Sequence, residues 1–285
     1  MMPENHPLIT IVTSTYNAKH LLGRTADSIR SQSFRRIQWI IADGNSSDGT
    51  VDLIKSYGSL VDKWISKRDS GIYQAWNNII PYADGEWVQF LGAGDELATP
   101  TALEEMAEHL DGAFPRYELV YGIIRFVTEK SRTVIEDVAV PWETMKGKWF
   151  MGRPMLPQHP EVFHHRSLFE NGGKFDERFS IAGDSHFLLK SILRKDPLYV
   201  PILVDCMSFG GKSGRIENAK EVAKEISAIN SELGIRPPFL HSSQEKFKLC
   251  AKQILLMIMP GRFLYSLADQ LRAVLRKPRR WRVDD

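Results

Sequence analysis

Polar residues follow a series of short apolar segments in the first third of the chain, and three of these residues are aspartates. The segment 8–13 runs into Ser14-Thr15-Tyr16-Asn17, and Asp43, Asp69 and Asp95 come at the exits of later segments. In an open α/β sheet, ligands bind outside the carboxyl ends of the strands. We therefore expect these residues to line one crevice. Carboxylate oxygens there can accept hydrogen bonds, take up a proton as a general base, or bind a hard cation.

Three other kinds of ligand site do not match the sequence. The first apolar segment ends in TSTYN rather than Gly-x-Gly-x-x-Gly, which argues against a Rossmann-type redox enzyme. The glycine-rich segment 209–215 is not a Walker A loop, because Cys206 stands where the first glycine would be needed. His159, His164 and His165 lack a cysteine partner or a helical spacing, so we do not expect a zinc site.

Strand and helix patterns alternate through the first 110 residues, and this predicts a mostly parallel sheet with right-handed crossovers. Thr99 is expected to be the N-cap of the last of these helices. Later segments predict a hairpin, a long loop at 141–160, and a mixture of helices and one strand. The expected strands are 8–13, 37–42, 63–66, 86–91, 119–126, 133–138 and 198–204, and the expected helices are 19–31, 48–57, 72–80, 100–110, 183–194, 218–233, 243–259 and 262–277.

Charge is distributed unevenly along the 285 residues. The formal net charge is +2, yet residues 246–285 hold ten Lys or Arg against three Asp, so the body is weakly acidic and the tail basic. The tail also has an apolar stripe at helical spacing, which is typical of a helix lying on an anionic lipid surface. A basic helix packed on the catalytic domain is the alternative. Two cysteines form no disulfide framework, and we expect neither a signal peptide nor a membrane-spanning helix.

Several of these segments resemble the family 2 glycosyltransferases, which have a GT-A fold. Residues 43–50, DGNSSDGT, resemble the family's Asp-Gly-Ser-Thr-Asp-Gly-Thr segment. Residues 69–77, DSGIYQAWN, resemble the Asp-Ser-Gly-Ile-Tyr-Asp-Ala-Met-Asn segment of a subgroup linked with bacterial exopolysaccharide, capsule and lipopolysaccharide assembly. Residues 175–184 resemble its Phe-Asp-Glu…Ala-x-Asp segment, and the likeness extends over residues 7–215.

The resemblance implies a nucleotide-sugar donor, with UDP favoured as the nucleotide. Asp43 and Asp69 would contact the nucleoside, His159 would lie near the donor sugar, and Lys212 would contact the diphosphate or cover the donor. Structural alternatives remain for several positions: Asn17 and Asp48 as helix caps, and Tyr73 and Trp76 as core residues. The donor-binding residues implied are Thr13, Thr15, Tyr16, Asn17, Asp43, Asp69, Gly71, Asn77, Gly94, His159 and Lys212.

The resemblance also implies a catalytic base and a metal ligand. Asp184 would take the proton of the acceptor hydroxyl in an inverting transfer, although it could also be a helix N-cap. Asp95 would hold Mg²⁺ or Mn²⁺ against the donor diphosphate. The family's preceding acidic positions are Gly92 and Gly94 here, which weakens the metal motif. A non-catalytic relative that binds nucleotide-sugars or glycans is therefore the main alternative.

The resemblance and the charge pattern together predict the domains, partners and location. We expect a GT-A catalytic domain at 1–215 and a basic helical extension at 216–285. The expected acceptor is a glycan or a lipid-linked saccharide of bacterial surface polysaccharide. We expect no nucleic-acid partner, a cytoplasmic protein, and contact of residues 243–285 with the anionic inner face of the plasma membrane.

Overall fold

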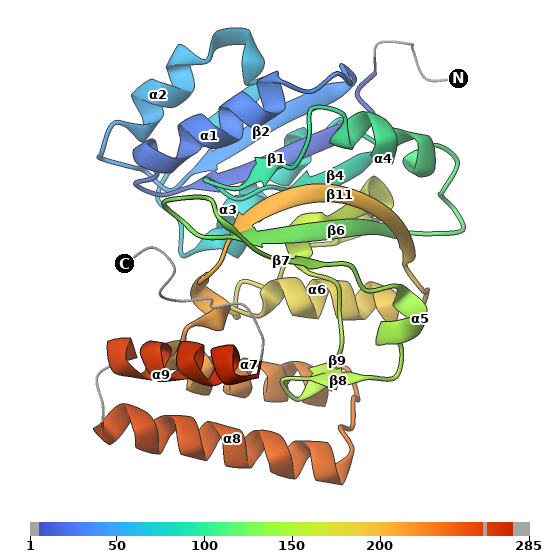
Figure 1. Cartoon of the computed structure of the whole chain (residues 1–285). Helices are drawn as coiled ribbons and strands as arrows, with labels where there is room; N and C mark the ends of the chain where they lie inside the picture. The colour runs from blue at the N-terminus through green and yellow to red at the C-terminus, as the bar shows by residue number, and fades with distance from the viewer. Residues whose placement is uncertain (1–5, 259–260, 276–285) are drawn as a thin grey trace. The chain divides into compact units, whose positions relative to one another are not determined.

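The computed structural model describes residues 6–258 and 261–275 and is a mixed α/β protein with one large sheet (Figure 1). Its described residues divide into two compact units. The first comprises the chain up to Ile124 together with Ala139–Trp142 and Pro157–Met207, and the second comprises Arg125–Val138, Glu143–Leu156 and the chain from Ser208 onward.

Four parallel strands form one half of the large sheet, in the order β3-β2-β1-β4. Helices connect them along the chain, so the strand and helix alternation read from the sequence is confirmed. The strands are β1 (Ile9–Thr15), β2 (Ile37–Asp43), β3 (Lys63–Ser66) and β4 (Trp87–Phe90), and the helices are α1 (Lys19–Arg30), α2 (Thr50–Ser56), α3 (Ile72–Ile79) and α4 (Ala102–Leu110).

The sheet continues beyond β4 in the order β10-β6-β11-β5, and β7 pairs with β6. β10 is antiparallel to both β4 and β6, and β11 is antiparallel to β5. The sequence of β10 is VFHH, and its two histidines obscure the apolar pattern of a buried strand. These strands are β5 (Glu96–Leu97), β6 (Leu119–Val127), β7 (Val134–Val138), β10 (Val162–His165) and β11 (Leu198–Ser208), and helix α6 (Gly183–Ile192) precedes β11.

The parallel strands are rich in apolar residues because helices cover the sheet that they form. Ile9, Ile11, Trp39 and Ile41 are buried in the core. Strands that are buried on both faces read as nearly continuous apolar runs, as β1 and β2 do. Their register then brings the polar residue at the end of each strand into line: Thr15 pairs with Asp43, and Asp43 pairs with Ser66.

Some elements differ from the sequence expectations. Thr101, rather than Thr99, is the N-cap of α4, and its carbonyl accepts the N–H of Glu105 at 2.9 Å; Thr99 lies two residues earlier. The expected loop at 141–160 contains short elements: α5 (Trp142–Met145), β8 (Trp149–Phe150) and β9 (Arg153–Pro154). The second unit also holds α7 (Ala219–Glu232), α8 (Phe239–Ile258) and α9 (Gly261–Val274). The expected ends of the last two helices, at 259 and 276–277, lie outside the described residues.

Candidate active site

Asp43 is the centre of a hydrogen-bond network at the ends of three parallel strands. Its Oδ1 accepts hydrogen bonds from the hydroxyls of Thr15 at 2.9 Å and Ser46 at 2.5 Å. Its Oδ2 accepts the backbone N–H of Ser46 at 2.9 Å and the hydroxyl of Ser66 at 2.7 Å. The residue is only 2% exposed. Asp43 therefore ties the loop after β2 to β1 and β3.

The network also determines the charge of Asp43. Burial raises the pKa of the carboxyl group, but the hydrogen bonds from Ser46, Ser66 and Thr15 outweigh burial, so the pKa lies below its ordinary value. Asp43 is consequently a carboxylate at neutral pH, and four protein donors already satisfy its two oxygens. Its direct contact with a nucleoside stays a prediction. What the structure adds is its role in fixing Gly44 and Asn45, which line the cavity beside it.

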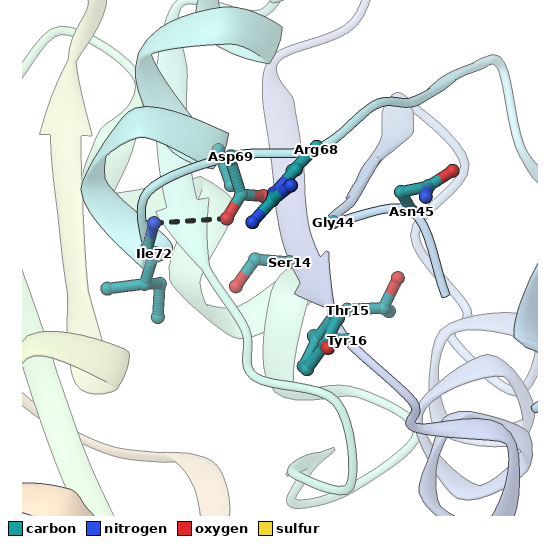
Figure 2. A pocket seen from close by; sticks show the side chains of 10 residues that line it. Ser14, Thr15, Tyr16, Gly44, Asn45, Arg68, Asp69 and Ile72 are labelled. Atoms are coloured by element: carbon teal, nitrogen blue, oxygen red, sulfur yellow. Dashed lines mark hydrogen bonds between the residues drawn. The ribbon is translucent and has the colours of Figure 1, made fainter. Parts of the chain in front are cut away.

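A cavity of about 650 Å³ lies outside the carboxyl ends of β1, β2 and β3 (Figure 2). Its walls come from three segments that are far apart in sequence: the end of β1, the loop after β2, and the turn between β3 and α3. The cavity lies at the sheet edge where the sequence predicted a crevice, but of the three aspartates expected to line it only Asp69 does; Asp43 and Asp95 do not. The residues that line it are Ser14, Thr15, Tyr16, Gly44, Asn45, Arg68, Asp69, Gly71, Ile72 and Ala75.

Two glycines shape the cavity wall. A Cβ on Gly44 would lie 3.0 Å from Oδ2 of Asp69 and 3.2 Å from Cδ2 of Tyr16, so a side chain there would press on both walls. Gly71 has φ of 142°, which L-residues with side chains rarely adopt. Because Gly71 immediately precedes α3, this backbone conformation turns the chain from the cavity wall into the helix.

Asp69 and Arg68 bring opposite charges to the same cavity. Burial raises the pKa of Asp69 and the nearby charge of Asp43 adds to the rise, whereas the N–H of Gly71, 3.0 Å from Oδ1, lowers it. Arg68 is exposed and lines the cavity next to Asp69. The sequence reading missed Arg68, although its position directly before Asp69 was the available signal. A guanidinium can bind phosphate oxygens in a bidentate geometry.

Three other residues predicted to bind the donor shape the surrounding loops and do not line the cavity. Thr13 is buried, and its hydroxyl accepts the indole N–H of Trp39 at 3.0 Å. Asn17 has φ of 50°, and its Oδ1 accepts the backbone N–H of Ser47 at 3.0 Å. The N–H of Gly94 donates to the hydroxyl of Thr25 at 2.9 Å. Their contact with a ligand stays a prediction.

Asp48 contacts the start of α2 as expected, although Gly49 rather than Asp48 is the N-cap of that helix. Its Oδ1 accepts the backbone N–H of Thr50 at 3.0 Å, in the first turn of α2, and its Oδ2 accepts the backbone N–H of Lys19 at 3.0 Å, in the first turn of α1. A hydrogen bond from the Thr50 hydroxyl is the main reason that the pKa of Asp48 is lowered. One carboxylate thus serves the N-termini of two neighbouring helices.

Asp95, the predicted metal ligand, lies in a turn beside Gly92. A Cβ built on Gly92 would lie 2.5 Å from Oδ2 of Asp95, so the carboxylate lies in the space that a side chain at position 92 would fill. The Thr25 hydroxyl donates to the backbone carbonyl of Asp95 at 2.9 Å and fixes the turn. Hard cations take oxygen ligands, and Mg²⁺ is often held by one or two carboxylates together with phosphate oxygens and water. Asp95 can supply one such ligand.

Asp184 lies in the first turn of α6, one residue past the helix start, and Ala182 is the N-cap. Its Oδ1 accepts the N–H of Ser185 at 2.6 Å. The turn before it packs against α3: a Cβ on Gly183 would lie 2.7 Å from Cε2 of Tyr73. Asp184 is therefore on a helix that starts against α3, whose own first residues line the cavity.

The remaining predicted residues lie elsewhere. His159 is buried and stacks on Trp76 with ring centroids 5.0 Å apart, and burial lowers its pKa to about 3, so its ring is neutral. Asn77 accepts the N–H of Phe175 at 2.9 Å. Lys212 begins a short 3₁₀ turn in the second unit, and its carbonyl accepts Nδ2 of Asn218 at 2.7 Å.

Across residues 6–258 and 261–275, no helix combines the length and the apolar character that crossing a bilayer requires.

Comparison with known proteins identifies relatives of the chain. The glycosyl transferase family 2 model matches residues 10–169. An uncharacterized glycosyltransferase of Mycobacterium tuberculosis is 31% identical over 68% of this chain and 72% of its own length. A PGL/p-HBAD biosynthesis glycosyltransferase of Mycobacterium bovis is 27% identical over 81% of this chain and 88% of its own length.

Solved structures share the fold. Staphylococcus aureus TarS 1–349, in complex with UDP-GlcNAc, has a TM-score of 0.60 at 17% identity, over 86% of this chain and 72% of TarS 1–349. The mannosyltransferase PcManGT of Pyrobaculum calidifontis, in complex with GDP-Man and Mn²⁺, has a TM-score of 0.61 at 19% identity, over 94% of this chain and 81% of PcManGT. The fold is GT-A, and the chain belongs to glycosyltransferase family 2.

Proposed function

We propose that this glycosyltransferase moves a sugar, with inversion, from a nucleotide diphosphate sugar to a glycan or a lipid-linked saccharide. The observation that carries the proposal is the cavity at the ends of the parallel strands, which combines Arg68, Asp69 and glycine-lined backbone. Its volume of about 650 Å³ is in the range of small-molecule sites. We propose UDP, the nucleotide bound to TarS, as the donor nucleotide, and GDP, as in the PcManGT complex, as the competitor to test.

The residues of the cavity suit the parts of such a donor. Asp69 can accept hydrogen bonds from a base N–H or from ribose hydroxyls, and Tyr16, whose side chain is exposed, offers a ring face to the base. Arg68 can bind diphosphate oxygens. The backbone near Gly44 and Gly71 can approach the ligand closely because neither residue has a side chain.

Asp184 is proposed as the base and Asp95 as the metal ligand. The acceptor hydroxyl oxygen would attack C1 of the donor sugar while the bond from C1 to the diphosphate oxygen breaks, and the diphosphate would leave with the electron pair. Asp184 would take the hydroxyl proton. Mg²⁺ or Mn²⁺, when held by Asp95, would neutralise the charge that develops on the leaving diphosphate. PcManGT, solved with Mn²⁺, supports the metal.

We propose that the product belongs to a bacterial surface glycan. The relative from Mycobacterium bovis is named for PGL/p-HBAD biosynthesis, which supports a lipid-linked or glycan acceptor. The catalytic part would be residues 1–215, and residues 216–285 would form an extension. The proposal requires a cytoplasmic enzyme. It would meet its acceptor at the inner face of the plasma membrane.

Helices α8 and α9 support the membrane contact. Exposed apolar residues recur every seven residues on α8 and every four on α9, so each helix carries an apolar stripe. Lys246 and Lys252 are exposed on α8 and supply positive charge for an anionic bilayer. The stripes consist of Leu240, Phe247 and Ile254 on α8 and of Phe263, Leu267, Leu271 and Leu275, the last just beyond the end of α9.

Flotation with vesicles that contain anionic lipid tests this contact in the full chain. Phe247→Ser with Leu271→Ser should reduce vesicle binding at least tenfold, since full burial of one such side chain is worth about 2 kcal/mol. Leu193→Ser, which removes an exposed leucine of the first unit, should leave binding unchanged. Equal vesicle binding by the wild type, the double variant and Leu193→Ser would show that the apolar stripes do not contact the membrane.

A non-catalytic relative is the second candidate, because Gly92 and Gly94 replace two acidic positions of the metal motif. A transfer assay separates the two. Purified full-length protein is incubated with UDP- and GDP-sugars, Mn²⁺ and pooled lipid-linked saccharides, and the anomeric configuration of any product is read by NMR. A β-linked product from an α-linked donor supports inverting transfer. Tight nucleotide binding with neither transfer nor donor hydrolysis would support the non-catalytic relative.

A further inference from the structure

Helix α3 has two sets of contacts that face different parts of the site. Its N-terminal residues Ile72 and Ala75, together with Gly71 before it, line the cavity. Its residues Tyr73 and Asn77, on the same helix, contact the segment 175–181, which leads directly into α6 and Asp184. The helix is eight residues long, so both sets of contacts lie within less than three helical turns.

Tyr73 is the central contact between α3 and the start of α6. Its hydroxyl donates to the backbone carbonyl of Ile181 at 2.7 Å, three residues before Asp184. Its ring stacks on Phe175 with centroids 5.9 Å apart, and it occupies the space where a side chain on Gly183 would project. The residue is only 4% exposed. A shift of Tyr73 would therefore move the backbone that carries Asp184.

Gln74 and Asn77 extend the same contact with hydrogen bonds. Oε1 of Gln74 accepts the N–H of Ser70 at 2.9 Å, and its Nε2 donates to Oε2 of Glu177 at 2.8 Å. Nδ2 of Asn77 donates to the carbonyl of Phe175 at 2.8 Å and to Oε1 of Glu177 at 2.9 Å. Glu177 thus accepts from both amides, and Gln74 joins it to the turn that forms the cavity wall.

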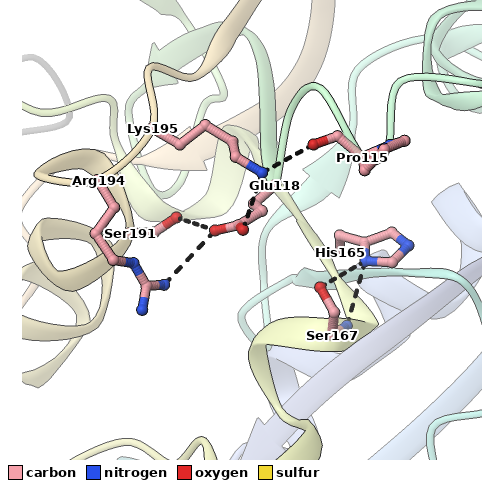
Figure 3. Close-up of polar contacts among 7 residues, drawn as sticks. All are labelled: Pro115, Glu118, His165, Ser167, Ser191, Arg194 and Lys195. Atoms are coloured by element: carbon pink, nitrogen blue, oxygen red, sulfur yellow. Dashed lines mark hydrogen bonds and ion pairs between the residues drawn. The ribbon is translucent and has the colours of Figure 1, made fainter.

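Glu118 contacts the C-terminal end of α6 and the residues that follow it, as Figure 3 shows. Glu118 accepts the hydroxyl of Ser191 at 3.2 Å and the ammonium of Lys195 at 3.1 Å, and Arg194 lies 3.6 Å from its Oε2. The helix is anchored at its C-terminal end by these groups, whereas its N-terminal end meets α3. The α3 contacts therefore act at the end of the helix that carries Asp184, together with Phe187, which stacks on Phe175 with ring centroids 4.5 Å apart.

We propose that Tyr73, Gln74 and Asn77 are positioning residues that couple occupancy of the donor cavity to the placement of Asp184. A ligand that contacts Gly71, Ile72 or Ala75 fixes the start of α3, and the three side chains transmit this to 175–184. The proposal rests on the proposed function for the role of Asp184, but the coupling itself requires only nucleotide binding. Two sites linked in this way share a coupling free energy.

Gln74 distinguishes this chain from the family segment that it resembles. The family segment that 69–77 resembles has aspartate at this position. An aspartate is one methylene shorter and would set a second carboxylate opposite Glu177, where like charges repel. The amide of Gln74 instead donates to Glu177 and accepts from Ser70.

Hydrogen–deuterium exchange of the full-length protein tests the coupling without any turnover. Saturating UDP should slow exchange in peptides covering 175–190 by roughly tenfold, because a bound ligand raises the free energy of local opening. Tyr73→Phe keeps the ring and removes the hydroxyl, and it should lose this protection while its Kd for UDP stays within about twofold of wild type. Tyr82→Phe, an exposed tyrosine of the same unit, is the matched control.

Gln74→Glu is the second variant, since it keeps the shape and replaces the donor that faces Glu177 with an acceptor. It should also lose the UDP-dependent protection. In transfer assays both variants should lower kcat by roughly 10- to 100-fold with little change in the donor KM, as expected when a catalytic group is misplaced rather than the donor site weakened.

Three results would overturn the coupling. The first is UDP binding to wild type without any change in exchange at 175–190. The second is normal protection and normal kcat in both variants. The third is an equal loss of UDP affinity and kcat, which would indicate general damage. Intact coupling in a protein that transfers no sugar would support the coupling and refute the proposed function, so the two failures are distinguishable.

Discussion

Glu161 should make the protein less stable as the pH rises through neutrality. It lies in the 3₁₀ turn His159–Glu161 that leads into β10, and only 1% of it is exposed. Its Oε1 accepts the N–H of Gln158 at 2.8 Å, whereas Oε2 has no hydrogen-bond partner among the described residues. Burial raises the pKa of Glu161 from 4.5 to about 8, and the backbone donors Gln158 and Ile124 offset only part of the rise.

The direction of this pH dependence follows from the protonation of Glu161 in the folded and the unfolded chain. Above pH 4.5 the unfolded chain has an ionised Glu161, whereas the folded chain keeps the proton until about pH 8, so folding takes up a proton in this interval. Each pH unit then costs about 1.4 kcal/mol of unfolding free energy. The stability linked to Glu161 is fully present below pH 4.5 and is lost as the pH rises to about 8. Between pH 5 and pH 8 the loss is about 4 kcal/mol.

Glu161→Gln isolates this effect because glutamine has the same shape and does not ionise. Urea unfolding at pH 5, 6, 7 and 8, followed by the fluorescence of the seven tryptophans, gives the unfolding free energies of both proteins. The difference between variant and wild type should increase in favour of the variant by about 4 kcal/mol from pH 5 to pH 8. Glu108→Gln, on the exposed face of α4, is the control for the effect of replacing any glutamate by glutamine. A difference that stays constant with pH would refute the reasoning.

The active-site predictions rest on three aspartates. Asp184→Asn should reduce transfer at least a hundredfold while the Kd for UDP, measured by calorimetry, stays near wild type; normal turnover would exclude Asp184 as the base. Asp95→Ala should abolish the increase in UDP affinity that Mn²⁺ produces, and an undiminished Mn²⁺ effect would exclude it as the ligand. Asp43→Asn should lower the unfolding free energy by about 3 kcal/mol, because an amide nitrogen cannot accept the hydrogen bonds that the carboxylate accepts. Urea unfolding at pH 7 measures this, and a loss below about 0.5 kcal/mol would contradict the network.

The parallel half of the fold could be predicted because its strands are apolar and its helices follow at regular intervals. Segments such as LITIVT and IQWIIA predict buried strands in an α/β protein. The polar residues that follow them, up to Thr15 and Asp43, are the last residues of β1 and β2. The position of the cavity followed from the same pattern, since parallel strands end at one edge of the sheet. Asp69 was found in this way, and the resemblance of residues 69–77 to the family segment added Gly71.

The finer features depend on contacts that sequence spacing does not contain. Asp43 is saturated by four donors only because the strand register sets Thr15 and Ser66 beside it. Arg68 lines the cavity beside Asp69, and its place directly before Asp69 was the only sign of this in the sequence. The hydroxyl of Tyr73 reaches a carbonyl 108 positions away, so the sequence alone indicated only a core aromatic residue.

Nucleotide binding to the full-length protein tests the central claim most directly. Thermal unfolding is measured with UDP, GDP, dTDP, CMP and NAD⁺, each with and without Mn²⁺. A nucleotide at a hundred times its Kd stabilises the folded state by about 2.7 kcal/mol, which raises Tm by roughly 5–10 °C in a chain of this size. The account predicts that UDP gives the largest rise and that Mn²⁺ increases it. No rise with any nucleoside diphosphate would contradict it.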